Sequence, residues 1–268
     1  SNQYYKPYRT YRAGTRYFRI RAVGRFIDGV AGDFSYKRYG AWSAAVTETI
    51  SPNDAYEKDK NWVYSTTYAE DGKYKKVITY ADGNGRKRQT LTNLSTDSTT
   101  VLVQTEYDKE GRPSLTSLPI PLLEQDLSYH GKLNENAAGN LYSPDDFAAG
   151  LPGAVMKTTS GSSQYYSANN PFLAGGDLWG GPNLNYIPDA EGYPFTQVKY
   201  MNDATGRIAA QGGVGPNHQL GSGHETKFFY ADPTAEELHM MFGGNVGRAE
   251  HYEKKMVIDP NGQVSFAY

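Results

Sequence analysis

The sequence predicts an all-β fold of antiparallel hairpins that follow one another as a meander. Its 268 residues include 23 tyrosines, 29 glycines and 14 prolines, a composition typical of aromatic-rich strands joined by many turns. Strand-like runs succeed one another with few helical segments between them, which favours antiparallel pairing of neighbours. A short turn motif also recurs four times at the ends of such runs. This pattern argues against a helical bundle or a doubly wound fold.

The recurring motif is Asp-x-x-Gly followed by Arg or Gln. Aspartate is favoured at the first position of a type I turn, where its carboxylate accepts hydrogen bonds from backbone N–H groups. Glycine at the fourth position supplies the positive φ that closes such a hairpin. We therefore predict four hairpin turns with structural Asp and Gly residues. These are Asp82 and Gly85, Asp108 and Gly111, Asp203 and Gly206, and Asp259 and Gly262.

A calcium loop is the alternative interpretation of these aspartates. Such loops place oxygen ligands at every second position and need several of them. Only Asp82 and Asn84 provide even two candidate ligands at that spacing, so the sequence favours turns and predicts no metal site. A degraded fifth copy, which lacks the first aspartate, spans residues 68–73.

Composition divides the chain into five regions. The first holds two strand candidates, over 15–23 and 41–50, and a polar linker follows it. The third is a dense hairpin region, the fourth is irregular, and the fifth returns to hairpins. The aromatic residues of the fourth region favour an ordered excursion that packs on the sheet. The regions are 1–50, 51–60, 61–120, 121–195 and 196–268.

Four consecutive strands are expected in the third region, over 61–68, 74–80, 86–94 and 101–107. Lysines and arginines near 73–76 and 86–88 would oppose the pairing of exposed strand edges with other chains.

One short helix is expected over 233–242. Asp232 is placed as its cap and Pro233 as its first residue, and Gly243 ends it. Leu238, Met241 and Phe242 would share the face that contacts the sheet. A single helical turn is also expected over 143–150, because a serine and a proline precede two aspartates that suit a helix N-terminus.

Charge and hydropathy exclude several function classes. The net charge of −2 provides no basic field to attract nucleic acid. No apolar run approaches 18 residues, so no transmembrane helix is expected. The chain has no cysteine and opens with polar residues that do not resemble a signal peptide.

No catalytic residue, metal site or cofactor is predicted. His224 and Glu225 lie near His218 in sequence, but glycines surround them and favour a polar loop over an acid–base pair. The glycine-rich stretch 212–216 lacks the Lys-Ser/Thr pair of a phosphate loop. Trp179, between glycine pairs, is the candidate for stacking on a ligand such as a sugar. The alternative is that Trp179 anchors its own glycine-rich loop.

The first region resembles the last two strands of a fibronectin type III domain, in which a strand with tyrosine and arginine precedes a Trp-Ser strand. Since a whole domain of that family is about twice as long as this region, we expect the chain to be a piece of a longer polypeptide. The matching residues are Tyr17, Arg19, Ile20, Ala22 and Val23 in the first strand, and Trp42, Ser43, Val46 and Thr47 in the second.

The hairpins resemble the Tyr-Asp repeats of Rhs and YD-repeat proteins, whose motif reads Tyr-Asp-x-x-Gly-Arg. Residues 107–112 match in full, and the turns at 82 and 203 match with insertions between the tyrosine and the aspartate. The turn at 259 lacks both the tyrosine and the arginine. The flanking runs also resemble the region that precedes the repeats in large surface proteins of Bacteroidetes-type bacteria. Together with the hairpins, they cover most of residues 59–268.

The resemblance implies a large secreted or cell-surface protein whose repeats wind into a β-sheet shell, in some cases around a toxin. Its partners would be the rest of its own polypeptide and an outer-membrane translocon, such as the type IX secretion system. The chain lacks the self-cleavage region and the toxin domain, so it would form the start or plug of a shell. We therefore expect a non-enzymatic structural segment. A glycan- or surface-binding adhesin module and a glycan-active enzyme are the alternatives.

Overall fold

The structure is a computed structural model of the chain that describes residues 14–25, 37–50, 56–96, 99–122, 127–147, 155–170 and 187–268. It is all-β and antiparallel, with a short helix near its C-terminal end, which confirms the predicted fold class. The chain divides into two compact units, Ser1–Lys60 and Asn61–Tyr268. No helix in the described ranges is long and apolar enough to cross a membrane.

The first unit contains two antiparallel strand pairs. Strand β1 (Gly14–Phe18) pairs with β4 (Val46–Ile50), and β2 (Val23–Arg25) pairs with β3 (Lys37–Tyr39). The expected strand over 15–23 is therefore divided in two, and the one expected over 41–50 begins only at its middle.

Ser43 explains the interruption of these strands. The N–H of Ile20 donates to the Ser43 hydroxyl at 3.0 Å, and the N–H of Ser43 donates to the Ile20 carbonyl at 2.8 Å. A side-chain oxygen thus replaces one carbonyl of the ladder, which breaks the regular pairing. The guanidinium of Arg21 lies here between the rings of Tyr39 and Trp42, at 3.8 and 4.4 Å, a cation–π arrangement.

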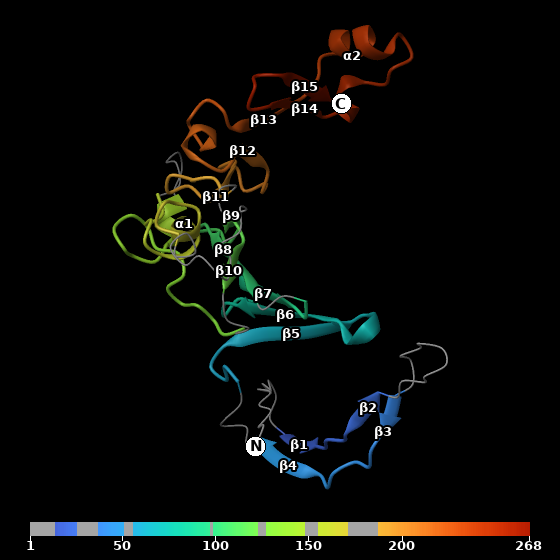
Figure 1. Cartoon of the computed structure of the whole chain (residues 1–268). Coiled ribbons are helices and arrows are strands. Elements are labelled where there is room, and N and C mark those ends of the chain that lie inside the picture. The colour runs from blue at the N-terminus through green and yellow to red at the C-terminus, as the bar shows by residue number, and fades with distance from the viewer. Residues whose placement is uncertain are drawn as a thin grey trace. The chain divides into compact units, whose positions relative to one another are not determined.

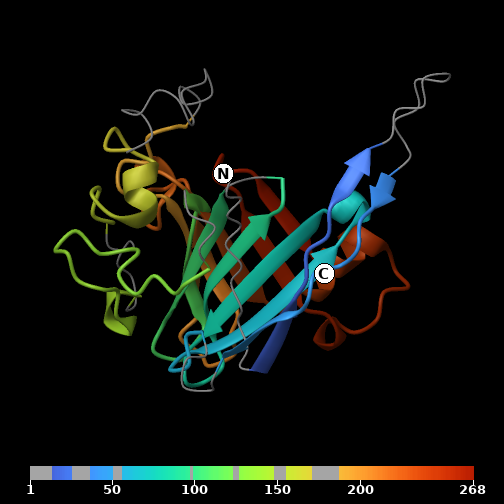
Figure 2. The ribbon, with the colours of Figure 1, turned by 60° about the horizontal axis from the view of Figure 1, so that its bottom comes forward.

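The second unit is built on one antiparallel sheet of 11 strands (Figure 1). Ten of them lie in the order β15-β14-β13-β12-β11-β9-β8-β7-β6-β5, and β10 pairs with β8. Figure 2 shows these strands side by side from another direction. Their bounds are β5 Asn61–Tyr68, β6 Tyr74–Ala81, β7 Lys87–Leu94, β8 Thr100–Tyr107, β9 Pro113–Ser117, β10 Ile120–Leu122, β11 Phe195–Tyr200, β12 Ile208–Gly212, β13 Thr226–Ala231, β14 Lys254–Ile258 and β15 Val264–Ala267.

The predicted strands of residues 61–107 agree closely with the structure. Strand β5 has the expected bounds, and β6, β7 and β8 each differ by one residue at one end. The local pattern suffices here because each strand is short and alternates in burial, and because β6 and β8 each end at a turn motif. The degraded copy over 68–73 also forms a hairpin turn, with a 3-10 turn over Glu70–Gly72 and a left-handed Asp71 at φ 59°.

One face of the sheet is buried with period two. On β7 the buried side chains are Gln89, Leu91 and Asn93, and on β8 they include Leu102 and Gln104. This face is therefore partly polar, unlike the apolar inner face of a typical sandwich. Its polar groups need hydrogen-bond partners, because a buried polar group without one is costly.

The excursion between β10 and β11 supplies part of this cover. Tyr80 donates its hydroxyl to the Leu127 carbonyl at 2.7 Å, and Tyr166 donates to the Pro119 carbonyl at 2.7 Å. A core of Leu115, Tyr142, Met156 and Phe195 lies between the sheet and the excursion. The chain returns to the sheet at β11, which pairs with β9.

Within the excursion, the expected helical turn is a 3-10 helix over Pro144–Phe147, and residues 148–150 lie outside the described residues. Helix α1 (Gly161–Tyr165) was not predicted, because its glycine, serines and glutamine give no apolar periodicity. Trp179 also lies outside the described residues. Two further 3-10 turns span Pro216–His218 and Ala249–His251.

Helix α2 (Ala235–Phe242) forms where the sequence predicts a helix, but it begins later. Its cap is Thr234 rather than Asp232, because Thr234 and Glu237 form a reciprocal capping box. The predicted end is confirmed, since Gly243 has a φ of 82°.

The predicted contact face of α2 is largely wrong. Leu238 is fully buried, whereas Met241 and Phe242 are 61% and 56% exposed. One buried leucine seats the helix, and the ring of Phe242 contacts Tyr268 at 6.0 Å between ring centres.

Candidate functional site: a repeated Asp–Arg–Tyr unit beside a buried polar layer

Three of the four predicted turns share one geometry. In each, the aspartate and the residue four positions later close the hairpin through their backbones, and the glycine N–H donates to the aspartate carbonyl. The aspartate Oδ1 also accepts the N–H of that fourth residue. The glycines have φ values of 77° at Gly85, 78° at Gly111 and 81° at Gly262, which a residue with a Cβ adopts only at a cost.

A guanidinium adds an ion pair to two of these turns. The Nε of Arg86 lies 2.8 Å from Asp82 Oδ2, and the Nε of Arg112 lies 2.7 Å from Asp108 Oδ2. Burial alone would raise the pKa of Asp82, but the hydrogen bonds from the backbone and side chain of Arg86 outweigh it and lower that pKa. In the fourth turn, Gln263 binds Asp259 through its backbone N–H and carbonyl and contributes no ion pair.

The turn at Asp203 differs from the other three. Its hairpin closes between the N–H of Met201 and the carbonyl of Arg207, at 2.8 Å, and Ala204 is left-handed at φ 58°. Asp203 accepts hydrogen bonds from the side chain and N–H of Thr205, and these lower its pKa. The two residues inserted after Tyr200 lengthen the loop, so Asp203 does not reach the arginine as its counterparts do.

Each turn arginine also contacts a tyrosine at, or one residue before, the end of the next strand of the sheet. The guanidinium lies over the tyrosine ring, and the tyrosine hydroxyl donates to the carbonyl of the residue after the arginine. The guanidinium lies 5.1 Å from the ring centre for Arg86 and Tyr107, 4.4 Å for Arg112 and Tyr200, and 5.1 Å for Arg207 and Tyr230. The hydroxyl-to-carbonyl distance is 2.7 Å from Tyr107 to Lys87, 3.0 Å from Tyr200 to Pro113, and 3.2 Å from Tyr230 to Ile208.

We call each aspartate, its arginine and the tyrosine of the next strand an Asp–Arg–Tyr unit; the unit at Arg207 lacks the aspartate contact. The spacing follows from strand register. Gln89 pairs with Gln104, and the same register extended three residues places Arg86 opposite Tyr107. The motif therefore ties each turn to the strand that follows it, and it explains why tyrosine, aspartate and arginine recur together.

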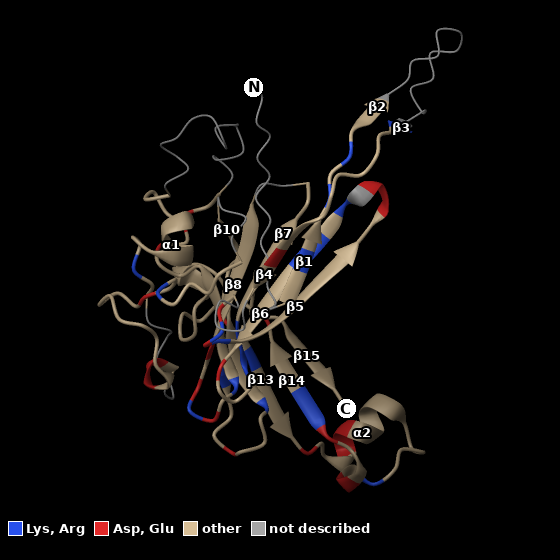
Figure 3. Ribbon diagram, turned by 90° about the horizontal axis from the view of Figure 1, so that it is seen from below, with Lys and Arg blue, Asp and Glu red and all other residues tan. Residues whose placement is uncertain are grey.

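Helix α2 replaces a turn in a fourth version of this arrangement. Lys254 begins β14, is hydrogen-bonded to Glu237 of the helix, and lies 5.0 Å from the ring centre of Phe266 and 5.8 Å from that of Tyr268. The hydrogen bond from Lys254 lowers the pKa of Glu237 and raises that of Lys254. Figure 3 shows the acidic residues of α2 and the basic residues of β14. The pairing of acid, cation and aromatic ring persists although the turn does not.

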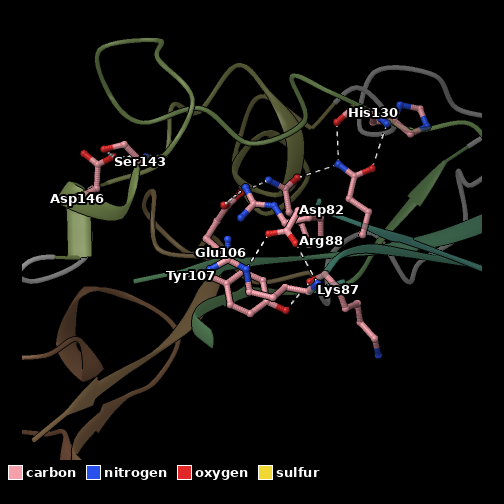
Figure 4. Close-up of polar contacts among 11 residues, drawn as sticks. Asp82, Lys87, Arg88, Glu106, Tyr107, His130, Ser143 and Asp146 are labelled. Carbon is pink, nitrogen blue, oxygen red and sulfur yellow. Dashed lines mark hydrogen bonds and ion pairs between the residues drawn. The ribbon is translucent and has the colours of Figure 1, made fainter. Parts of the chain in front are cut away.

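A buried polar layer lies beside the Asp–Arg–Tyr unit at Arg86 (Figure 4). Arg88 Nη2 pairs with Glu106 Oε2 at 2.5 Å, and Gln104 Nε2 donates to the other oxygen of Glu106. Gln104 in turn accepts from Gln89 at 3.1 Å. Gln89 binds the backbone of His130 through both amide atoms, at 2.7 and 3.0 Å. One chain of hydrogen bonds thus links the sheet to the excursion.

Glu106 is the carboxylate of this layer, and its pKa is raised. It is 4% exposed, and burial raises its pKa above the ordinary value despite the opposing effects of Arg88 and Gln104. A raised pKa means that the folded state favours the protonated carboxyl. Glu106 therefore contributes most to stability below its unfolded pKa near 4.5, and that contribution is lost as the pH rises through the folded pKa.

The raised pKa of Glu106 predicts how the stability of the chain depends on pH. On acidification from about pH 7 to about pH 4.5, we expect the free energy of unfolding of the wild type to rise relative to that of Glu106→Gln, which cannot titrate. Urea denaturation of both proteins at each pH measures the difference. The lowered pKa values of Asp82 and Asp203 have the opposite effect on stability, but these aspartates are common to both proteins. A constant difference between the two proteins would show that burial of Glu106 does not shift its pKa.

A cavity of about 540 Å³ opens beside the second Asp–Arg–Tyr unit, lined by parts of β9, β11 and the 3-10 turn over Pro144–Phe147. Its two carboxylates, Asp108 and Glu110, both pair with Arg112, at 2.7 and 3.1 Å. They are therefore not arranged as two carboxyls facing each other across a cleft, the geometry that glycoside hydrolysis requires.

The described contacts of His218, His224 and Glu225 are those of a polar loop. The rings of His218 and His224 lie 6.2 Å apart, and His224 Nδ1 is 3.0 Å from the Pro260 carbonyl. Glu225 accepts a hydrogen bond from the N–H of Gly223, as expected of a polar loop. In the part of the chain that the structure describes, no group of three or more His, Asp or Glu side chains could hold a metal ion.

The sequence pattern predicts the turn residues but not the polar layer or the role of the tyrosines. A signal for the layer exists: Gln89 shares the strand parity of buried Leu91, and Gln104 and Glu106 share that of Leu102. Polar residues in a buried register indicate an internal network. The partner of each tyrosine could not be read locally, because it lies on another hairpin.

One family matches most of these elements. The family described as Domain of unknown function (DUF6443) matches residues 53–231, which span the sheet from β5 to β13 and include the first three turn motifs. The chain belongs to this family. No curated protein matches the chain. Within the DUF6443 match lie the buried polar layer, the excursion and the cavity, whereas α2 and the last hairpin follow it.

Proposed function

We propose that the chain is a non-enzymatic structural segment of a large secreted or cell-surface protein of the YD-repeat class. In this role it forms the start or plug of a β-sheet shell. It works together with the rest of its own longer polypeptide, which leaves the cell through an outer-membrane translocon of the type IX kind.

The repeated Asp–Arg–Tyr unit carries this proposal. A contact that joins each turn to the next strand lets a sheet grow by one hairpin at a time with the same local chemistry. In the 11-stranded sheet, this contact recurs at Arg86, Arg112 and Arg207, and Lys254 provides a variant. Such repetition is typical of proteins whose repeats contact mainly their neighbours in sequence. The described carboxylates of the cavity are engaged in ion pairs, which favours a structural role over hydrolysis.

The proposal is tested by locating the native protein in the cells that produce it. An antibody raised against residues 61–268 is expected to detect a polypeptide well above 29.7 kDa in the surface or culture fraction. Protease treatment of intact cells should remove that signal. Deletion of the type IX translocon should retain the polypeptide inside the cell, with a cytoplasmic enzyme as the fractionation control. A 29.7 kDa protein confined to the cytoplasm would overturn the proposal.

A further inference from the structure

The cavity of about 540 Å³ next to Arg112 has a size typical of small-molecule sites. Its walls come from distant parts of the chain: Ser114 from β9, Gln197 from β11, Phe147 from the excursion and Leu220 from the loop after β12. Strand pairing of β9 with β11 and the packing of Phe147 against the core that contains Leu115 and Phe195 hold these walls in place.

Gln197 is the unusual residue of this lining. Its side chain is 2% exposed, and its amide oxygen receives no hydrogen bond from the residues that the structure describes. A buried amide oxygen without a donor costs free energy. The terminal torsion of glutamine is soft, so a small rotation turns this oxygen toward a donor placed in the cavity.

The charges around the cavity are largely compensated. Asp108 and Glu110 share Arg112, and Lys109 pairs with Asp145 at 2.5 Å. Lys199, exposed on β11, is the remaining charged residue of the lining. A site with compensated charges does not select a highly charged ligand, because little net field remains to repay the desolvation of that ligand.

The lining combines an aromatic ring with planar amides. Phe147 stacks on Tyr142, with ring centres 5.8 Å apart and planes inclined at 22°, and its ring also lines the cavity. Gln197 and Asn202 provide the amides. An aromatic ring packs against the C–H face of a sugar, while amides bind its hydroxyl groups as both donors and acceptors.

From this geometry we infer that the cavity is a binding site for a neutral sugar ring, either free or as the end of a glycan chain. A sugar hydroxyl donates to the amide oxygen of Gln197, and the ring of Phe147 packs against the sugar. This inference does not depend on the structural role proposed above, because the cavity exists whether or not the chain belongs to a shell.

The test is titration of the full chain with glucose, galactose, mannose, N-acetylglucosamine and maltose, followed by saturation-transfer NMR and calorimetry. At least one sugar is expected to bind with a Kd of about 1 mM or tighter. Gln197→Leu keeps the side-chain volume but removes the amide, and it should weaken binding at least about tenfold. Tighter binding of maltose than of glucose would identify a glycan chain, and equal binding a single ring.

The control variant is Gln211→Leu, the same substitution at an exposed glutamine of β12, which should leave binding unchanged. Circular dichroism checks that both variants fold. If Gln197→Leu does not fold, Asn202→Ala on the exposed rim replaces it, with a weaker affinity again expected. The inference is overturned if no sugar of the panel binds at about 10 mM, or if the cavity variants bind as tightly as the wild type.

Discussion

Replacement of Asp108 by alanine is expected to lower the free energy of unfolding by about 3 kcal/mol. Asp108 is 7% exposed and accepts hydrogen bonds from both the N–H and the Nε of Arg112, at 2.8 and 2.7 Å. Alanine would remove the turn acceptor and leave a partly buried guanidinium without this carboxylate. Asp108→Asn keeps an acceptor for the backbone N–H but not the charge, so it should lower the free energy of unfolding by about half as much. Urea denaturation followed by circular dichroism measures all three proteins.

Asp203→Ala is the matched control for this prediction. Asp203 occupies the same position of the motif but is exposed and bonds only within its own loop, to Thr205. Its loss should cost less than about 1 kcal/mol. Equal destabilisation by Asp108→Ala and Asp203→Ala would contradict the importance of the Asp–Arg–Tyr unit, because the turn alone would then explain both.

Gly161→Ala is expected to destabilise the chain by about 3 kcal/mol or more. Gly161 has a φ of 53°, and an added Cβ would lie 2.1 Å from the Leu133 carbonyl oxygen and 2.3 Å from Asn134 Oδ1. Asn134 Oδ1 accepts the N–H of Ser162 at 2.9 Å, so the backbone at the start of α1 must move. We expect a lower melting temperature and faster hydrogen exchange in residues 155–170.

Gly206→Ala separates backbone strain from steric overlap in this prediction. Gly206 also has a positive φ, 73°, but no atom lies within 4 Å of an added Cβ. The strain alone should cost about 1 kcal/mol. A Gly161→Ala protein no less stable than Gly206→Ala would mean that the excursion is not packed closely around Leu133 and Asn134.

Local signals predicted the hairpins because the relevant forces act over a few residues. Alternating burial, β-branched residues and a turn motif specify β5 to β8 almost to the residue. Local signals also predicted α2 but placed its cap at Asp232, because both Asp232 and Thr234 are good capping residues. Glu237 decides between them, since it closes the capping box with Thr234 and also binds Lys254 of β14.

In the candidate site, too, some features follow from neighbouring residues and others depend on contacts between distant parts of the chain. The positive φ values of Gly85, Gly111 and Gly262 follow from the motif. The cavity beside Gln197 has no local signature, because it forms where β11 returns to pair with β9 after the excursion. The failure of Asp203 to bind its arginine also depends on how the hairpin closes, which two inserted residues alter.

The all-β class, the antiparallel hairpins and their turn residues follow from the amino-acid pattern, because these depend on backbone conformations that neighbouring residues impose. The folded structure was needed to show that each turn arginine meets the tyrosine of the next strand, that Glu106 and Gln104 are buried together, and that a cavity opens near Arg112. These features depend on the register between strands and on the return of a long excursion to the sheet. Contacts between residues distant in sequence fix both, so a local pattern does not contain them.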